Sequence, residues 1–214
     1  MKVALIAGYS GLVGTELLHL LLESDKYNKV IAIGRRPIDL QHPKLDQRTV
    51  DFNNLEFNDS INDVFCCLGT TIKKAGSKEQ FRLVDYQYPL NLAMAGQQAG
   101  ATCFSLVSAH GASSASNIFY SQVKGNLEDS ISSLNYPKLE IVRPSLLLGE
   151  RSEKRAGEDF GKMIMSALGF LFIGPLKNIK GIQASSVAKA MIFFANDGGG
   201  GNRVHYSSVL QQFN

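Results

Sequence analysis

Apolar runs and segments with helical spacing alternate along the chain as far as residue 142. Six of the apolar runs have the length of buried strands, and a longer helical pattern follows several of them. The expected strands are Lys2–Ala7, Lys29–Ile33, Arg48–Phe52, Asp63–Leu68, Thr102–Val107 and Leu139–Val142. This order predicts an α/β protein with a doubly wound parallel sheet and helices on both faces.

The expected helices between these strands are Thr15–Glu23, Ser77–Gly100 and Tyr120–Leu134. Pro89 is expected to break or bend the second of them. Towards the end, the pattern predicts helices over Met163–Phe172 and Ser185–Ala195, a glycine turn over 198–202 and a last strand over Arg203–Tyr206. We expect residues 1–214 to form one domain, in which residues 150–182 cap the substrate side.

A glycine-rich turn joins the first expected strand to the first expected helix. Glycines at 8, 11 and 14 let the backbone approach an anion, which the amide groups and the positive end of the helix dipole then meet. The hydroxyl of Ser10 is placed to reach a phosphate oxygen. The turn predicts a dinucleotide diphosphate site formed by Gly8, Ser10, Gly11, Leu12, Val13 and Gly14.

Two arginines follow the second strand, at the position that meets the adenosine ribose in dinucleotide-binding sheets. A carboxylate there selects NAD, whereas Arg35 and Arg36 suit a 2′-phosphate by charge and by bidentate geometry. The sequence therefore predicts NADP(H) in preference to NAD(H). The alternative is a solvated strand end.

Two further strand ends carry residues suited to the rest of the nucleotide. The carboxylate of Asp51, before Phe52, can accept a hydrogen bond from the adenine amino group, and a simple turn residue is the alternative. Gly69 and Thr70 follow Leu68, where a small residue lets the chain pass close to the nicotinamide ribose. We therefore expect all five residues to line the cofactor site.

Tyr120 and Lys124 lie four residues apart on an expected helix and so share a face. The pKa of tyrosine is about 10, and a neighbouring ammonium lowers it by stabilising the phenolate. Tyr120 is then expected to exchange a proton with substrate, while Lys124 holds the ribose hydroxyls. Ser108, which ends the preceding strand, is expected to bind the reacting oxygen.

Together these motifs resemble the atypical short-chain dehydrogenases/reductases, and more narrowly their Tat-interacting-protein group with its bacterial relatives. The matching segments are Gly8–Gly14, Ile33–Arg36, Val50–Phe52, Phe65–Thr71, Lys74–Gly76, Ser108–Gly125, Arg143-Pro144 and Leu146-Leu147. The resemblance implies a single-domain Rossmann fold that binds NADPH, with Ser108, Tyr120 and Lys124 as catalytic residues and Pro144 beside the nicotinamide. It also implies a link to regulation and to protein partners.

One residue departs from the pattern of the superfamily. Many relatives carry an asparagine on the helix after the fourth strand, as part of a proton relay, and the corresponding residue here is Asp85. A carboxylate at this place is expected to alter both the proton relay and the pKa values of neighbouring groups.

Composition narrows the partners and the compartment. The net charge is +3 and the basic residues are scattered, which predicts no nucleic-acid surface. The longest apolar run, 167–173, is far shorter than the ~20 residues of a spanning helix. Three cysteines without metal-ligand spacing argue against disulfides and metals. With no leader before the first strand, we expect a cytoplasmic protein.

The expected function is an NADPH-dependent oxidoreductase that acts on a small carbonyl or hydroxyl compound. His110, Arg151 and Arg155 are the candidates for substrate contact, and for each a solvated loop is the alternative. A nucleotide-sensing protein with little turnover and a sugar-nucleotide epimerase are the other functions considered. A protein partner and a homo-oligomer are left open.

Overall fold

The computed structural model describes residues 1–148 and 181–214. Seven strands of these residues form one sheet, in the order β3-β2-β1-β4-β5-β6-β9, and every neighbouring pair is parallel. Their bounds are β1 Lys2–Ala7, β2 Tyr27–Gly34, β3 Leu45–Thr49, β4 Asp63–Cys66, β5 Cys103–Val107, β6 Lys138–Arg143 and β9 Gly201–Tyr206. Two short strands, β7 (Leu147–Leu148) and β8 (Ile182–Gln183), pair separately. The prediction of a doubly wound parallel sheet is confirmed.

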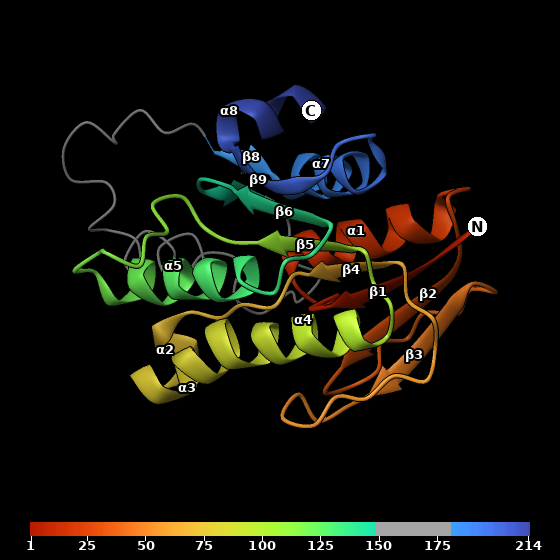
Figure 1. Cartoon of the computed structure of the whole chain (residues 1–214), viewed down its shortest axis with the longest axis horizontal. Coiled ribbons are helices and arrows are strands. Elements are labelled where there is room, and N and C mark those ends of the chain that lie inside the picture. Colours follow the sequence, from red (N-terminus) through yellow and green to blue (C-terminus); the bar gives the residue numbers. More distant parts are fainter. Residues whose placement is uncertain (149–180) are drawn as a thin grey trace.

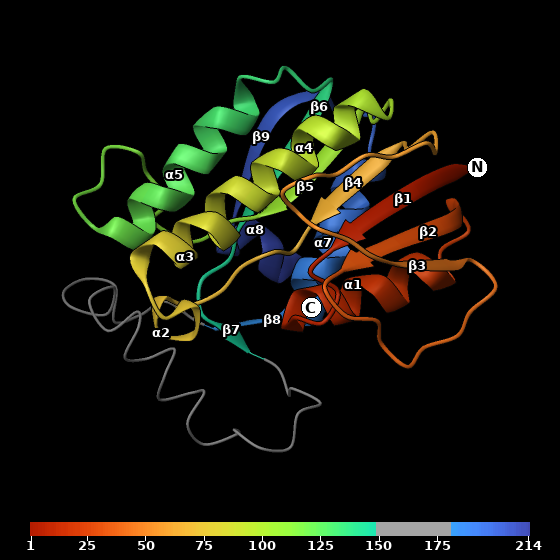
Figure 2. The ribbon, with the colours of Figure 1, turned by 90° about the horizontal axis from the view of Figure 1, so that it is seen from below.

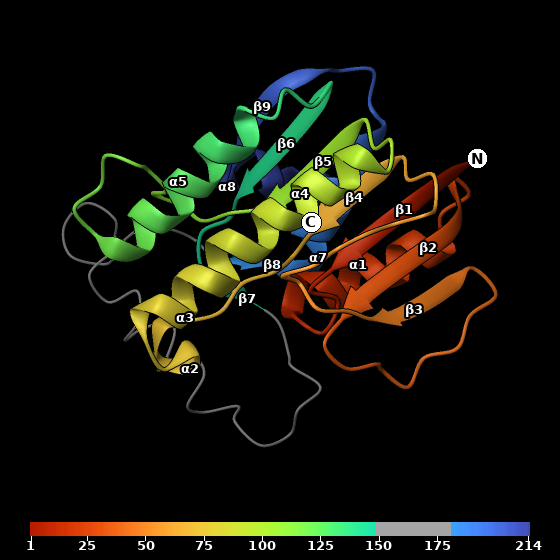
Figure 3. The same ribbon diagram turned by 60° about the horizontal axis from the view of Figure 1, so that its bottom comes forward.

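Long helices cover both faces of the sheet (Figure 1). On one face lie α1 (Leu12–Glu23) and α7 (Ala184–Asn196), and on the other lie α4 (Tyr88–Gln98) and α5 (Phe119–Ser132). Figure 3 shows α4 and α5 in front of the strands. The shorter helices are α2 (Ile72–Ala75), α3 (Lys78–Arg82), α8 (Ser207–Leu210) and a 3₁₀ turn over Gln211–Phe213.

The inner strands are largely apolar because each face of the sheet borders its own core. Along β1, Ala4 and Ile6 belong to the core under α1 and α7, whereas Leu5 and Ala7 belong to the core under α4 and α5. Cys66 and its neighbour Cys67 are divided between the two cores in the same way. Continuous apolar runs are typical of strands buried on both faces.

The third strand lies three residues earlier than the sequence predicts, at Leu45–Thr49. Phe52 is buried, but outside the sheet, because its ring stacks on that of Tyr88 at a centroid distance of 5.4 Å. The apolar side chain of Phe52 thus serves a ring contact and does not belong to the strand that the sequence pattern predicts.

The long helix before β5 is divided by a π-helical turn over Leu83–Gln87 rather than broken at Pro89. Pro89 has no N–H to donate to the carbonyl of Asp85, four residues earlier, and its ring would clash with that carbonyl. In the wider turn, the Tyr88 N–H donates instead to the Leu83 carbonyl, five residues back. The expected helix over 163–172 lies outside the described residues, as does the expected cap over 150–182 except for its last two residues.

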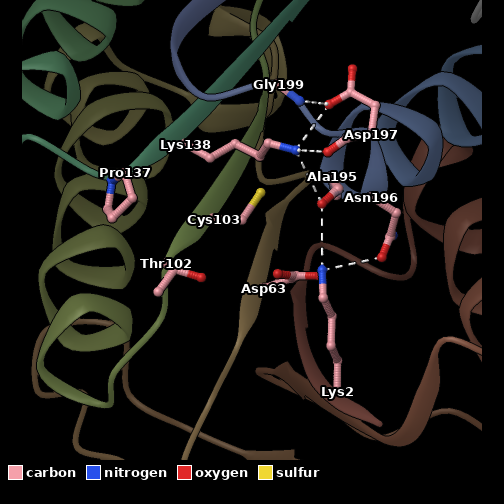
Figure 4. Close-up of a pocket in the computed structure, with 10 residues that line it drawn as sticks. All are labelled: Lys2, Asp63, Thr102, Cys103, Pro137, Lys138, Ala195, Asn196, Asp197 and Gly199. Carbon is pink, nitrogen blue, oxygen red and sulfur yellow. Dashed lines mark hydrogen bonds and ion pairs between the residues drawn. The ribbon is translucent and has the colours of Figure 1, made fainter.

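The amino ends of the strands surround a cavity of about 260 Å³ that is lined by ion pairs (Figure 4). The ammonium groups of Lys2 and Lys138 approach the Ala195 carbonyl from opposite sides, each at 3.5 Å. Lys2 also pairs with Asp63, and Lys138 with Asp197, both at 2.9 Å. These cations stabilise the carbonyl end of α7, so this edge of the sheet anchors a helix.

The last strand is held by a buried carboxylate on its neighbour. Glu140 is fully buried on β6, where it pairs with Arg203 and, at 2.6 Å, with His205 Nε2. The His205 ring stacks on Phe194 of α7 at 3.6 Å between centroids. β9 is thereby joined to both β6 and α7.

Candidate nucleotide site and its catalytic residues

The glycine turn lies where the strand order reverses, between β1 and β4. Gly8 has φ +86°, and a Cβ on it would lie 2.4 Å from the Cys67 carbonyl group. A Cβ on Gly14 would lie 2.1 Å from the Gly8 carbonyl oxygen. Both positions therefore require glycine, and the turn brings the start of α1 against the chain that leaves β4.

The start of α1 has no side-chain cap among the described residues. Gly11 is its N-cap residue and supplies no side chain to satisfy the amide groups of the first turn. Ser10 is exposed, and Leu12 and Val13 form the beginning of the helix. These first-turn amides are the groups that bind phosphate at a helix N-terminus.

Tyr9, which the sequence analysis did not select, joins the glycine turn to the arginine pair. Its ring is buried, and its hydroxyl donates to the Arg36 carbonyl at 2.7 Å. A Cβ on Gly34 would lie 2.6 Å from the Tyr9 hydroxyl oxygen, so the end of β2 must be glycine to admit the ring. The side chains of Arg35 and Arg36 are exposed and form no ion pair in the described part of the chain.

Asp51 and Phe52 have local partners. Asp51 Oδ1 accepts hydrogen bonds from the amide of Asn53 at 3.0 Å and from its side-chain nitrogen at 2.8 Å. The Phe52 carbonyl accepts from Asn91 at 2.9 Å. This geometry supports the turn interpretation of Asp51.

Lys124, on α5, forms a buried ion pair with Asp85. Its Nζ lies 2.8 Å from Asp85 Oδ1, and the side chains are 4% and 1% exposed. The second carboxylate oxygen of Asp85 accepts a hydrogen bond of 2.8 Å from the Thr70 amide. Gly69 lies directly beside the pair, since a Cβ on it would lie 3.5 Å from Asp85 Oδ1 and 3.8 Å from Lys124 Nζ. The pair therefore adjoins the segment after β4 that is expected to line the cofactor site.

The pKa of Tyr120 is raised, not lowered as the sequence predicted. Burial raises this pKa, Lys124 opposes the increase, and the Asp85 carboxylate adds to it. Although burial lowers the pKa of Lys124, Asp85 and Tyr120 raise it above the ordinary lysine value. Lys124 therefore remains a cation whose charge is largely met by Asp85.

The Ser108 hydroxyl donates to the carboxylate of Glu128, also on α5. Glu128 in turn receives the guanidinium of Arg143, from the end of β6, through Nε at 3.1 Å and through Nη2. In this arrangement the Ser108 hydroxyl faces the ion pair between buried Glu128 and half-buried Arg143, which the sequence pattern does not predict.

Of the remaining predicted site residues, the structure describes His110 and Pro144. The amide of His110 donates to the Pro144 carbonyl at 3.0 Å, which joins the loops after β5 and β6. Arg151 and Arg155 lie outside the described residues.

The turns that follow β1, β2, β4, β5 and β6 all emerge at one edge of the parallel sheet, opposite the N-terminus, where Figure 2 shows α2 and β7. No helix in the described ranges is both long and apolar enough to cross a membrane.

Comparison with known proteins identifies relatives along most of the chain. Protein HTATIP2 of Rattus norvegicus is 37% identical over 174 residues, which cover 78% of this chain and 72% of that protein. Protein FMP52, mitochondrial, of Debaryomyces hansenii is 34% identical over 194 residues, 86% of this chain and 85% of that protein. The Candida albicans protein of the same name is 32% identical over 203 residues, covering 90% of this chain and 87% of that one. No family model matches the chain.

Solved structures share the fold at low sequence identity. A short chain dehydrogenase family protein from Francisella tularensis superposes with a TM-score of 0.69 at 16% identity, with 98% of each chain covered. MoeE5 in complex with UDP-glucuronic acid and NAD gives a TM-score of 0.71 at 17% identity, covering 95% of this chain and 75% of that one.

The names of the fungal relatives correct one expectation. Because these relatives are named as mitochondrial proteins, the expectation of a cytoplasmic location is wrong. The sequence identity to these relatives and the share of each chain that is covered decide the family. The chain belongs to the family of HTATIP2 and FMP52, and it shares its fold with a short chain dehydrogenase family protein.

Proposed function

We propose that this protein is an NADPH-binding oxidoreductase that acts on the carbonyl or hydroxyl group of a small molecule. The observation that carries the proposal is the junction at the reversal of strand order, where Tyr9 ties the glycine turn to Arg36. Such a junction joins a diphosphate site to a 2′-phosphate site in one rigid unit. Its uncapped helix start and exposed arginines fit a dinucleotide with an additional phosphate.

The residues present fit the other parts of the nucleotide as well. Asp85 Oδ1 is buried and, beyond its ion pair, makes no hydrogen bond of regular geometry with the described residues. This oxygen lies beside Gly69, so a ribose hydroxyl at that position could donate the hydrogen bond that the oxygen lacks. The nicotinamide, when bound, supplies or accepts the hydride. Tyr120 would move the proton at its phenolic oxygen, and Lys124 would orient the ribose.

Calorimetric titration with NADPH and NADH tests the proposal. We expect NADPH to bind the wild-type protein at least tenfold more tightly than NADH, and Arg35→Ala/Arg36→Ala to remove most of the difference. Lys26→Ala/Lys189→Ala removes two exposed positive charges elsewhere and is the matched control. Equal affinity for the two nucleotides in the wild-type protein would refute the NADPH preference, and no binding of either would refute the function.

A nucleotide-sensing protein with little turnover is the second candidate. The contact that favours it is the hydrogen bond from Ser108 to Glu128, which occupies the hydroxyl expected to hold the reacting oxygen. Micromolar NADPH binding without NADPH oxidation across a panel of aldehydes and ketones would support this candidate. The likeness to MoeE5, solved in complex with UDP-glucuronic acid and NAD, concerns the fold alone and does not favour the epimerase alternative.

A further inference from the structure

Asp85 occupies an unusual backbone position beneath the candidate cofactor site. It lies on the π-helical turn over Leu83–Gln87, and Pro89 accounts for that turn because it cannot bond to the Asp85 carbonyl. The wide turn directs the Asp85 side chain toward two donors from different elements, Thr70 after β4 and Lys124 on α5.

The ion pair changes what Lys124 does to its neighbour. A lone ammonium one helical turn from a tyrosine lowers the phenol's pKa by stabilising the phenolate. Here the Asp85 carboxylate lies 2.8 Å from that ammonium, and both groups are buried. At a third group such a pair acts as a dipole, so the carboxylate offsets part of the effect of the lysine on Tyr120.

We propose that Asp85 is a positioning residue that fixes the Lys124 ammonium and offsets its charge, so that Tyr120 keeps its proton at neutral pH. The inference deepens the proposed function and rests on it, because it makes Tyr120 a proton donor suited to carbonyl reduction.

The other groups around Tyr120 leave this balance intact. Phe81, from α3, covers the Tyr120 ring at 5.6 Å between centroids and carries no charge. Cys66, from β4, has a thiol pKa raised to about 12 by burial, so it is neutral. Glu128, one turn beyond Lys124, is engaged by Arg143. Lys124 and Asp85 are thus the two charges that decide the protonation of Tyr120 among the groups that the structure describes there.

The test is an ultraviolet titration of Tyr120 in the protein without nucleotide, in which the spectrum of a matched Tyr120→Phe variant is subtracted each time. In the wild-type protein we expect tyrosinate to form only above the ordinary tyrosine range. In Asp85→Asn the lysine charge is no longer offset, and we expect Tyr120 to titrate at least about one pH unit lower. Equal titration in these two proteins would overturn the proposal.

A neutral double variant keeps the test decisive where Asp85→Asn fails to fold, as circular dichroism would reveal. Asp85→Asn/Lys124→Met removes both charges, so Tyr120 should titrate within about half a unit of the wild-type value if the two charges offset each other. A wild-type value at least about one unit below that of the double variant would overturn the proposal. Because the titration uses no nucleotide, its failure is distinguishable from a failure of NADPH to bind in calorimetry.

Discussion

The Ser108 hydroxyl donates to the Glu128 carboxylate, which lies one helical turn beyond Lys124 on α5. The same helix therefore presents two buried charged groups in succession, each met by a residue of another element. Lys124 is paired by Asp85 of the π-helical turn, and Glu128 is paired by Arg143 at the end of β6. This succession fixes the rotation of α5 against the sheet and thus the direction of Tyr120.

Glu128→Ala should destabilise the fold strongly. The change leaves the buried Ser108 hydroxyl without its acceptor and the half-buried Arg143 guanidinium with only its Tyr206 hydrogen bond, which costs about 2 kcal/mol or more in the free energy of unfolding. Urea denaturation followed by circular dichroism measures the loss. Asp129→Ala changes the next residue, whose side chain is exposed, and should lower the free energy of unfolding by less than about 0.5 kcal/mol. Equal effects of the two changes would contradict the role of the Glu128 pair.

Tyr9→Phe should weaken the binding of NADPH more than that of NADH. The lost hydrogen bond of 2.7 Å holds the backbone of Arg36, so its removal loosens the arginine pair while the glycine turn remains. A loss of about 1 kcal/mol corresponds to a roughly fivefold weaker NADPH affinity, which calorimetry resolves. Tyr136→Phe is the matched control, because Tyr136 is equally buried and donates to the Ala93 carbonyl in the other core. A similar loss of NADPH affinity in both variants would mean that Tyr9 acts through general stability.

How far the sequence predicted this site depends on the distance over which each contact acts. The glycine turn and the spacing of Tyr120 and Lys124 are local patterns, and the structure places the turn after β1 and the two side chains on α5. The partners of the charged residues are not local. Lys124 meets a carboxylate 39 positions earlier in the chain, and Ser108 meets one 20 positions later. No spacing rule connects such residues, so the raised pKa of Tyr120 was beyond the reach of the sequence.

The fold shows the same limit. Five of the six apolar runs located their strands because burial on both faces requires continuous hydrophobicity. The third strand was misplaced by Phe52, whose apolar side chain serves a stacking contact with Tyr88. Pro89 predicted an irregular helix correctly, but the wider turn that accommodates it begins six residues earlier, at Leu83.

Acid should destabilise the protein in part through Asp59, which bridges Lys29 and Arg48 at the β3 edge. The arginine and then the lysine lower the Asp59 pKa to about 2, against about 3.9 in an unfolded chain. A lowered folded-state pKa gives stability that is present above about pH 4 and lost as pH falls toward 2. Asp59→Asn should therefore show a smaller loss of thermal stability between pH 5 and pH 2 than the wild-type protein. Asp39→Asn alters an exposed carboxylate without an ion pair in the described ranges and should leave the loss unchanged.

Tyr120→Phe should abolish turnover and leave NADPH binding within about twofold of the wild-type value. The change removes the phenolic oxygen, which makes no hydrogen bond within the described residues, and keeps the ring that packs on Phe81. The fold and the nucleotide site therefore have no reason to change, whereas the proton can no longer be transferred. The rate of NADPH oxidation, measured with the best aldehyde or ketone of the panel, is compared with calorimetric affinity in the same preparation. Tyr86→Phe is the control. It removes a hydroxyl that hydrogen-bonds to Ser130, which lies on α5 as Tyr120 does, and it should retain turnover. Full turnover by Tyr120→Phe would show that another group moves the proton, since a phenylalanine ring has none to give.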